Sequence, residues 1–429
     1  MENSVKNLIQ FIDHSPSCFH VIENAKKQFL EHGFIQLEEK EHWNLEEGKS
    51  YFVERNGSSM IAFHLPKKDF QGFHIVASHS DSPTYRIKEQ PEMSVEKHYT
   101  KLNIERYGGM IPETWFDRPL SVAGRIIIEE NGQIKDQLVN IDRDLMIIPN
   151  LAIHMSRSSN ESKQLNPQKD LLPLCGGNLT KDGFEEMIAK ESGVEKEDIL
   201  SYDLFLYNRM RGTTLGINEE FVAAPKLDDL ECAYSSIEGM LNAKLSEDYV
   251  TVCAVFDNEE VGSGTKQGAG STFFPEVLKR ISYLCGKNEE EYYMAVADSF
   301  MLSADNAHAV HPNYQDKTDP TNRSYINEGI VLKYNASQKY TTDANSAALV
   351  KYLCKKEKIK CQVFFNRSDM LGGSTLGNIL TGQVSIKAAD IGLPQLSMHS
   401  TYETAGCKDL DDMITLMGSF YELGKEVQI

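Results

Sequence analysis

The sequence predicts an α/β protein in which a sheet covered by helices on both faces is interrupted by an inserted β-rich domain. Short apolar, β-branched or aromatic runs alternate with amphipathic helical patterns in the first and last parts of the chain. This alternation is typical of an α/β sheet that is buried on both sides. From about residue 93 to 218 the pattern changes to alternating strands and turns, which indicates a β-rich insertion.

Helices are expected at both ends of the chain. Apolar residues in 5–30 recur at spacings of three and four and are interrupted near Ser15 and Pro16, which predicts two amphipathic helices. A third helix is predicted in 228–245, because one helical face collects its apolar side chains. These are Leu230, Tyr234, Ile237 and Leu241. The stretches 346–358 and 410–427 show the same pattern.

Four short runs predict buried strands, because each is rich in apolar, β-branched or aromatic residues. They are 72–79, 248–257, 292–298 and 361–366. Within the insertion, 124–142 predicts a hairpin around Asn131 and Gly132, and the polar tract 156–170 predicts a mobile loop. The domain organisation that follows is a main domain in two parts, 1–92 and 219–429, with the inserted domain at 93–218.

Composition narrows the class of protein. The 429 residues suffice for two or three domains, and 41% hydrophobic with 25% charged residues is ordinary for a globular chain. The net charge of -19 argues against a nucleic-acid partner. No stretch approaches the roughly 20 apolar residues of a membrane span, and the N-terminus lacks the pattern of a signal peptide. We therefore expect a cytoplasmic protein without a membrane partner.

Cysteine usage restricts the kind of metal site. The eight cysteines are scattered singly, without close pairs, which fits reduced thiols and disfavours a disulfide framework or a thiolate zinc site. Any metal ion would need histidine and carboxylate ligands.

Polar residues gather where the predicted strands end, which is where open α/β sheets bind ligands. They are His79, Asp81, Asp228, Glu259, Glu260, Asp305, His308, His311 and His399. Each has an ordinary explanation when it is taken singly: Asp228 or Asp229 could simply cap a helix, and adjacent acids on a loop are commonly solvated charges. Together they form a nitrogen- and oxygen-rich set suited to zinc, manganese or cobalt.

The spacing of these residues makes chemical sense. A carboxylate two residues after His79 can fix the tautomer of a ligating imidazole. Of two neighbouring glutamates, one can bind metal while the other takes a proton from metal-bound water. These considerations predict a metal site with a carboxylate placed to take a proton from metal-bound water.

Seven fragments in order resemble the aspartyl aminopeptidase family of dizinc exopeptidases. They are "SHSDSP", "IPNLAIHMSR", "PKLDDL", "FDNEEVGS", "SADNAHAVHPN", "GIVLKYNASQKYTT" and "PQLSMHS". The resemblance covers essentially the whole chain, and it implies a mixed-sheet α/β/α metallopeptidase domain with an inserted β-rich oligomerisation domain. It also implies an aminopeptidase with two divalent metal ions, zinc in the first place and manganese or cobalt as alternatives.

The resemblance assigns roles to individual residues. His79 and Asp305 resemble the ligands of one metal, Glu260 and His399 those of the other, and Asp228 the carboxylate that bridges both. Glu259 resembles the general base, and Asp81 the group that orients His79. His308, Lys333 and Tyr340 occupy positions where the family contacts substrate. His154 resembles a histidine that the inserted domain offers to the active site of a neighbouring subunit.

The family usually forms assemblies of twelve subunits, so a homododecamer is implied. Its name implies peptide substrates with an N-terminal Asp or Glu, and Lys333 could pair with the acidic side chain. Three alternatives stay open at this stage: an aminopeptidase of the same fold that prefers neutral or hydrophobic N-terminal residues, a hydrolase of N-acyl amino acids, and a catalytically silent assembly module.

Overall fold

The computed structural model describes residues 2–156, 164–178 and 182–427. Part of the polar tract predicted as a mobile loop, 157–163, lies outside these ranges. In the described residues the strands form three sheets, of nine, six and five strands. None of the described helices is long and apolar enough to cross a membrane.

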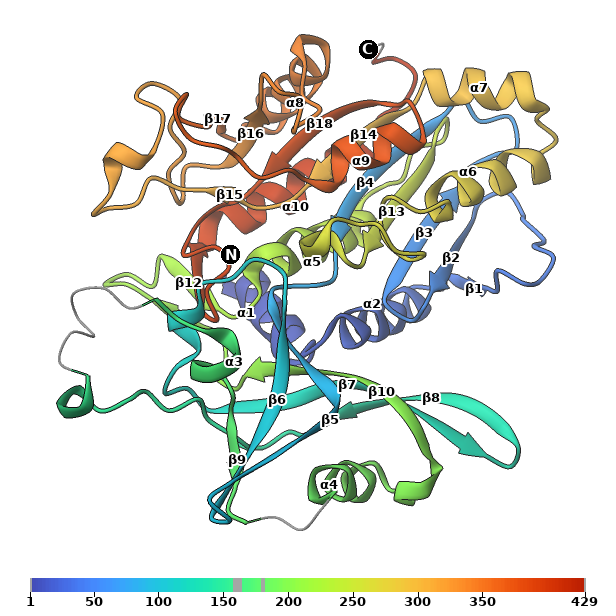
Figure 1. Cartoon of the computed structure of the whole chain (residues 1–429). Coiled ribbons are helices and arrows are strands. Elements are labelled where there is room, and N and C mark those ends of the chain that lie inside the picture. The colour runs from blue at the N-terminus through green and yellow to red at the C-terminus, as the bar shows by residue number, and fades with distance from the viewer. Residues whose placement is uncertain (1, 157–163, 179–181, 428–429) are drawn as a thin grey trace.

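The nine-stranded sheet is the centre of the main domain (Figure 1). Its strands, in spatial order, are β1 (Ile35–Leu37), β2 (Lys49–Arg55), β3 (Ser59–Leu65), β13 (Val250–Phe256), β4 (Phe73–His79), β14 (Phe300–Ala304), β18 (Lys387–Gly392), β16 (Ile330–Tyr334) and β17 (Cys361–Phe365). The pairs β13 with β4, β4 with β14 and β14 with β18 are parallel, whereas β3 with β13 and β16 with β18 are antiparallel. The sheet is therefore mixed, as expected.

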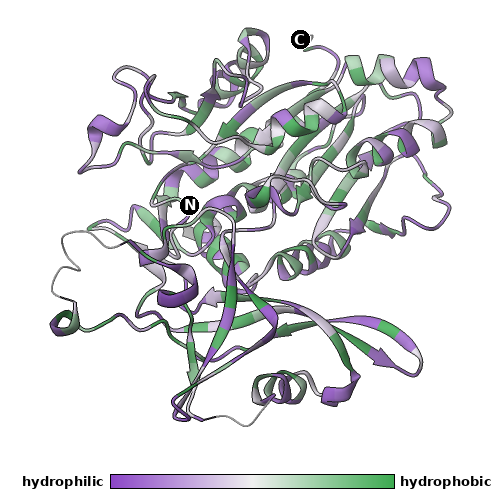
Figure 2. Ribbon diagram, in the orientation of Figure 1, coloured by the Kyte–Doolittle hydropathy of each residue, from purple (hydrophilic) through white to green (hydrophobic). Residues whose placement is uncertain are grey.

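Helices cover both faces of this sheet, and each face has its own apolar core. One core takes side chains from α1 (Glu2–Asp13), α2 (Cys18–Glu31), α5 (Leu227–Asn242), α8 (Ala344–Glu357) and α10 (Cys407–Tyr421). The other takes them from α6 (Phe273–Leu284), α7 (Glu289–Ala297) and α9 (Leu376–Gln383). Strands β4 and β13 are buried along their whole length, and the strands of this sheet are largely hydrophobic in Figure 2, as expected for a sheet covered on both faces.

The six-stranded sheet forms a separate layer below the main domain in Figure 1. All its pairings are antiparallel, in the order β8 (Gln133–Asn140), β7 (Leu120–Glu130), β10 (Ile199–Asn208), β5 (Thr84–Val95), β6 (Tyr99–Tyr107) and β9 (Leu174–Gly176). The predicted hairpin is confirmed: β7 and β8 join through Asn131 and Gly132, both with positive φ, as a tight two-residue turn requires. The short helices α3 (Pro167–Asp170) and α4 (Gly183–Ser192) also belong to this part of the chain.

A small third sheet joins the two layers. It contains β11 (Thr213–Leu215), β12 (Phe221–Ala224), β20 (Glu403–Gly406), β19 (Pro394–Leu396) and β15 (Ala307–His308). Strand β12 leads directly into α5, and the chain between β19 and β20 carries His399. This sheet therefore fixes two of the predicted site segments against each other.

One strand prediction is wrong. The run 292–298 lies in helix α7, and the strand of that region is β14, which begins at Phe300. The helix begins in a capping box, in which the Asn288 side chain accepts from the Glu291 N–H and the Glu291 side chain accepts from the Asn288 N–H. The composition of this apolar run suits a strand or a helix, and the capping box at its start favours the helix.

Candidate metal centre

Five predicted site residues meet at one edge of the nine-stranded sheet. His79 ends β4 and Asp305 directly follows β14. Because these neighbouring strands are parallel to β13, their carboxyl ends lie together with the two glutamates that follow β13. Asp228 comes from the first turn of α5.

The carboxylate of Asp228 lies between two histidines. Its Oδ1 is 3.6 Å from Nε2 of His79, and its Oδ2 is 3.2 Å from Nε2 of His399. His399 Nε2 is also 3.3 Å from Oε1 of Glu260. Each oxygen of Asp228 thus faces a different imidazole, and Glu260 stands beside the second one.

These side chains form overlapping groups whose ligand atoms lie within 4.8 Å of one another. One group contains His79, Asp228, Asp229 and Asp305, and a second contains Asp228, Glu260 and His399. A third joins His79 to Glu259 and Glu260. Asp228 is common to the first two groups, so the arrangement can hold two cations that share one carboxylate.

Buried oxygen atoms without partners indicate that cations fit here. Oδ1 of Asp228, Oδ1 of Asp229 and Oε1 of Glu260 are buried and receive no hydrogen bond from the described residues. Leaving such atoms unpaired is costly, and bound cations would satisfy them. Imidazole nitrogens with carboxylate oxygens suit zinc, manganese or cobalt.

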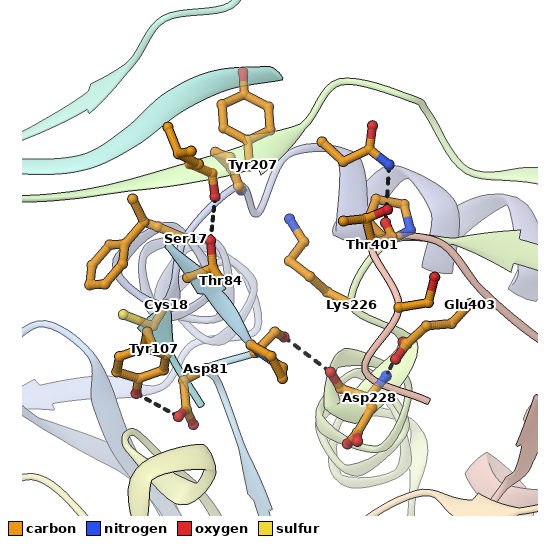
Figure 3. Close-up of a pocket in the computed structure, with 18 of the residues that line it drawn as sticks. Ser17, Cys18, Asp81, Thr84, Tyr107, Tyr207, Lys226, Asp228, Thr401 and Glu403 are labelled. Carbon is orange, nitrogen blue, oxygen red and sulfur yellow. Dashed lines mark hydrogen bonds between the residues drawn. The ribbon is translucent and has the colours of Figure 1, made fainter. Parts of the chain in front are cut away.

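Asp81 connects His79 to the glutamate pair. Its Oδ1 lies 3.3 Å from Nδ1 of His79 and accepts the Glu259 N–H at 3.1 Å, and its Oδ2 accepts the Glu260 N–H at 3.2 Å. The Tyr107 hydroxyl, from β6 of the inserted sheet, donates to the same Oδ2 at 2.6 Å (Figure 3). Nδ1 of His79 donates to the backbone carbonyl of Asp81 at 3.1 Å, and the Asp81 carboxylate beside it fixes the short helical turn η5 (Glu259–Val261).

The two glutamates have different surroundings. Oε1 of Glu260 approaches His399, whereas the described residues donate no hydrogen bond to the carboxylate of Glu259. Burial raises the pKa of Glu259 to about 8. The negative charges of Asp305 and Asp81 add to this rise, and the attraction of His79 opposes it. A carboxyl group with so high a pKa is able to hold a proton near neutral pH.

Asp228 behaves in the opposite way. Burial alone would raise the pKa of its carboxyl group, but the neighbouring imidazoles of His399 and His79 outweigh burial and lower the pKa. Asp228 is therefore ionised between its two histidines, which is the state that a metal ligand needs.

Lys333 lies beneath Asp305 and is only 2% exposed. Its Nζ donates to the carbonyl oxygens of Asp305 and Asn306 at 2.7 and 3.2 Å and lies 3.4 Å from Oδ1 of Asp305. The Tyr340 ring, also buried, has its centroid 5.2 Å from Nζ. The cation therefore supports the Asp305 segment.

The remaining two predicted residues belong to none of the metal-ligating groups that the described part of the chain forms. His308 ends β15 with its ring 6.1 Å from the Phe364 ring, and it lies close enough to Lys333, Asp228 and His399 for their charges to act on it. His154 is exposed on the turn η2 (Ile153–Met155) and belongs to none of the groups formed by described residues. His311, which the sequence also placed at a strand end, is likewise in none of the groups formed by described residues.

Sequence reasoning missed three residues of the site. Asp229 was considered only as a helix cap, yet it stands with His79 and Asp305, and its Oδ2 accepts the His79 N–H at 3.1 Å. Glu403 is buried and accepts the N–H of Asp228 at 2.9 Å and that of His399 at 2.6 Å. Tyr107 reaches Asp81 from the inserted sheet. The only local signal that could have pointed to Glu403 is its position four residues after His399.

The inserted part also approaches the centre through its backbone. The turn Gly108–Gly109 follows β6, and a Cβ on Gly108 would lie 3.1 Å from the Cβ of Glu260. Gly108 has a φ of +77°, which favours glycine. The N–H of Ile111 donates to the His399 carbonyl at 3.0 Å. This turn therefore closes the Glu260 and His399 side of the centre.

Comparison with known proteins gives a consistent result. Residues 11–421 match the family model described as aminopeptidase I zinc metalloprotease (M18). A probable M18 family aminopeptidase 2 of Clostridium acetobutylicum is 45% identical, covering 97% of this chain and 98% of that protein. A protein of the same description from Pseudomonas aeruginosa is 37% identical, covering 97% of each chain.

Solved structures share the fold. One is the cryo-EM structure of the Ape4 and Nbr1 complex, with a TM-score of 0.95, 36% identity and coverage of 98% of this chain and 85% of that one. Another is the structure of the mApe1 dodecamer of S. cerevisiae, with a TM-score of 0.87, 27% identity and coverage of 98% and 97%. The predicted fold class is confirmed by these similarities together with the sheet topology.

Proposed function

The chain belongs to the M18 family of aminopeptidase I zinc metalloproteases, and from this membership we propose that it releases N-terminal Asp or Glu from peptides with the help of two divalent ions. The family is one of metallo-aminopeptidases, so the predicted enzyme class is confirmed. The number of ions, their identity and the acidic preference are the proposed part.

The position of Asp228 carries the proposal of two ions. Its oxygens face His79 and His399 separately, and each imidazole has a further carboxylate beside it, Asp305 for the first and Glu260 for the second. We assign His79 and Asp305 to one ion, Glu260 and His399 to the other, and Asp228 to both. Zinc suits this ligand set, as do manganese and cobalt.

When bound, a pair of divalent ions supplies Lewis-acid polarisation of the scissile carbonyl and lowers the pKa of an attacking water. Glu259 is the residue that we assign to proton transfer: its carboxylate accepts the proton of the attacking water and delivers it to the leaving amine. Asp81 positions it, because the Glu259 N–H donates to Oδ1 of Asp81.

The surroundings of the centre suit a substrate with a free amino terminus. Asp229 and Glu259 belong to the metal-ligating groups but are not assigned to an ion, so their carboxylates remain to attract a substrate ammonium group, which a blocked amine lacks. For the acidic preference, the buried charge of Lys333 beside Asp305 provides a positive potential behind the centre. We assign His308 and Tyr340 to contacts with the peptide.

A matrix of substrates and metals tests this function. Metal-depleted protein is reloaded with Zn²⁺, Mn²⁺ or Co²⁺ and assayed on peptides that start with Asp, Glu or Leu, each with a free or an acetylated amine. We expect cleavage only of free amines and a higher kcat/KM for Asp and Glu. Faster cleavage of the Leu peptide would instead support the neutral preference, and cleavage of acetylated substrates would support an N-acyl hydrolase.

We further propose that the inserted domain, 93–218, mediates assembly into a homododecamer. The relative from S. cerevisiae was solved as a dodecamer, and the segment of this chain around His154 exposes apolar side chains: Leu151 at 55%, Ile153 at 47% and Met155 at 77%. Exposed apolar patches commonly mark interfaces. Light scattering should give about twelve times the chain mass of 48.4 kDa, and a monomer mass would contradict the proposal. In such an assembly we assign His154 to a neighbour's active site.

A further inference from the structure

A cavity lies where the inserted sheet meets the main domain. The centre of a water molecule can occupy about 60 Å³ of it, and the wider empty space of about 690 Å³ includes open solvent at its mouth. Its walls come from the turn between α1 and α2, the end of β10, and the residues that precede α5. The lining contains none of His79, Glu259, Glu260, Asp305 and His399, but it includes Asp81 and Asp228. The cavity therefore borders the metal-ligating groups on the side of these two carboxylates.

Most of the wall is apolar. Trp115, Phe205 and Tyr207 supply aromatic surface, and Pro83 and Pro225 add to it. The hydrogen-bonding groups of the wall are largely used: the Thr84 hydroxyl donates to the Leu206 carbonyl and the Asn208 amide donates to the Thr401 carbonyl. A bound molecule would therefore meet mainly carbon atoms and ring faces.

Lys226 is the one basic residue among those that line the cavity. Its Nζ donates to the Ser15 carbonyl at 2.6 Å, and no carboxylate of the described residues lies within 4.0 Å of it. An ammonium group has three donors, so two remain for a ligand. The charge of Asp13 acts on Lys226 only from beyond this distance. A largely enclosed cation without a direct counter-ion is costly, and an anion that pairs with it is correspondingly stabilised.

The acidic residues of the lining occupy the opposite end. Figure 3 shows the Lys226 side chain extending away from Asp228 into the space between Thr84 and Thr401. The carboxylate of Glu403 already accepts two backbone N–H groups. The carboxylate of Asp81 already accepts the Tyr107 hydroxyl and the N–H of Glu259. An anionic group at the Lys226 end is therefore kept away from these charges.

We propose that this cavity is a binding site for a small organic carboxylate with an aromatic or similarly apolar body. The carboxylate pairs with the ammonium group of Lys226, and the body lies against Trp115, Phe205 and Tyr207. Since the cavity also touches Asp228 and Glu403, an occupant contacts the back of the metal-ligating segments without entering the centre. The proposal is independent of which substrate the enzyme cleaves.

Calorimetry on the metal-loaded full chain tests this site with phenylacetate as the probe and phenylacetamide as its uncharged match. We expect saturable binding of phenylacetate and at least about tenfold weaker binding of the amide, since a hydrogen bond to a charged group contributes about 1.5–3 kcal/mol. Lys226→Met keeps the length of the side chain without its charge, and should weaken phenylacetate binding by a similar factor. Equal binding of both probes, or no binding of phenylacetate, would overturn the proposal.

A second arm separates this site from the metal centre. If phenylacetate bound to the metal ions, Lys226→Met would bind it normally and a chelator would abolish binding, which also overturns the proposal. If the site is the cavity, chelated wild-type protein still binds. Should Lys226→Met fail to fold, Lys226→Arg keeps the charge and should retain phenylacetate binding. The comparison of phenylacetate with phenylacetamide on the wild-type chain tests the proposal without any variant.

Discussion

The carboxylate of Glu403 accepts the backbone N–H of Asp228 at 2.9 Å through Oε2, while its Oε1 accepts the N–H of His399 at 2.6 Å. Glu403 begins β20, and Asp228 opens α5, so a single buried side chain ties two segments that are far apart in sequence. It touches no substrate, and we regard it as a positioning residue for the shared ligand Asp228 and for His399.

Glu403→Gln should therefore weaken metal binding more than it weakens the fold. The amide has one oxygen in place of two, so one of the two N–H groups loses its acceptor. Changes in groups that orient metal ligands typically cost 10- to 100-fold in metal affinity, and we expect a loss in that range in a chelator competition assay. Glu403→Asp, which keeps both oxygens, should recover part of the affinity. An unchanged affinity in Glu403→Gln would contradict the positioning role.

Glu259→Gln tests the proton-transfer assignment. The variant should bind metal like the wild type, because Glu259 is not among the assigned ligands, while kcat falls by roughly a hundredfold or more. Metal analysis and steady-state kinetics on the same preparation measure both. Asp228→Asn is the matched contrast, since it should lose metal. A fully active, metal-replete Glu259→Gln enzyme would refute the assignment.

Much of the architecture could be predicted from local pattern. The spacing of apolar residues predicted α5, α8 and α10, because each helix buries one face against the sheet. Nearly continuous apolar runs predicted β4 and β13, because both faces of these strands are covered. The error at 292–298 has a local cause: the apolar run suits either structure, and the capping box of Asn288 that decides it was not considered.

The strand-end rule explains why His79, Asp305 and the two glutamates could be named from sequence, since parallel neighbours bring their carboxyl ends together. Glu403 and Tyr107 follow no such rule. Glu403 begins the four-residue strand β20 and Tyr107 ends β6, and each reaches the centre only because a different sheet places it there. Such partners depend on tertiary packing, which no local pattern encodes.

Tyr107→Phe tests the link between the inserted sheet and the centre. The change removes the hydroxyl that donates to Asp81 at 2.6 Å and accepts from the Asn258 amide at 2.8 Å. Asp81 keeps its bonds from the glutamate turn, so we expect kcat/KM to fall by about three- to tenfold, in line with roughly 0.5–1.5 kcal/mol for one hydrogen bond. Tyr99→Phe, at an exposed tyrosine of the same strand, is the control. Equal activity in both variants would show that the inserted sheet does not support Asp81.

His74→Phe should make the protein more resistant to acid. His74 lies on β4 with 3% exposure, and its ring stacks on Tyr249 with centroids 4.0 Å apart. Burial lowers the pKa of His74 to about 3, whereas the unfolded chain titrates near 6.5. Below pH 6.5 the unfolded chain therefore takes up a proton that the folded chain does not. The titration of His74 leaves the free energy of unfolding unchanged above pH 6.5, and lowers it increasingly as pH falls from 6.5 toward 3.

One pH unit below 6.5 corresponds to about 1.4 kcal/mol. Phenylalanine preserves the stacked ring and removes the titration. The free energy of unfolding of His74→Phe relative to wild type should thus rise by about 1.4 kcal/mol between pH 7.5 and pH 5.5, measured by denaturant titration at both pH values. Because the comparison is a difference between pH values, a constant cost of the substitution cancels. Parallel pH dependences in the two proteins would mean that the folded chain protonates His74 as readily as the unfolded one.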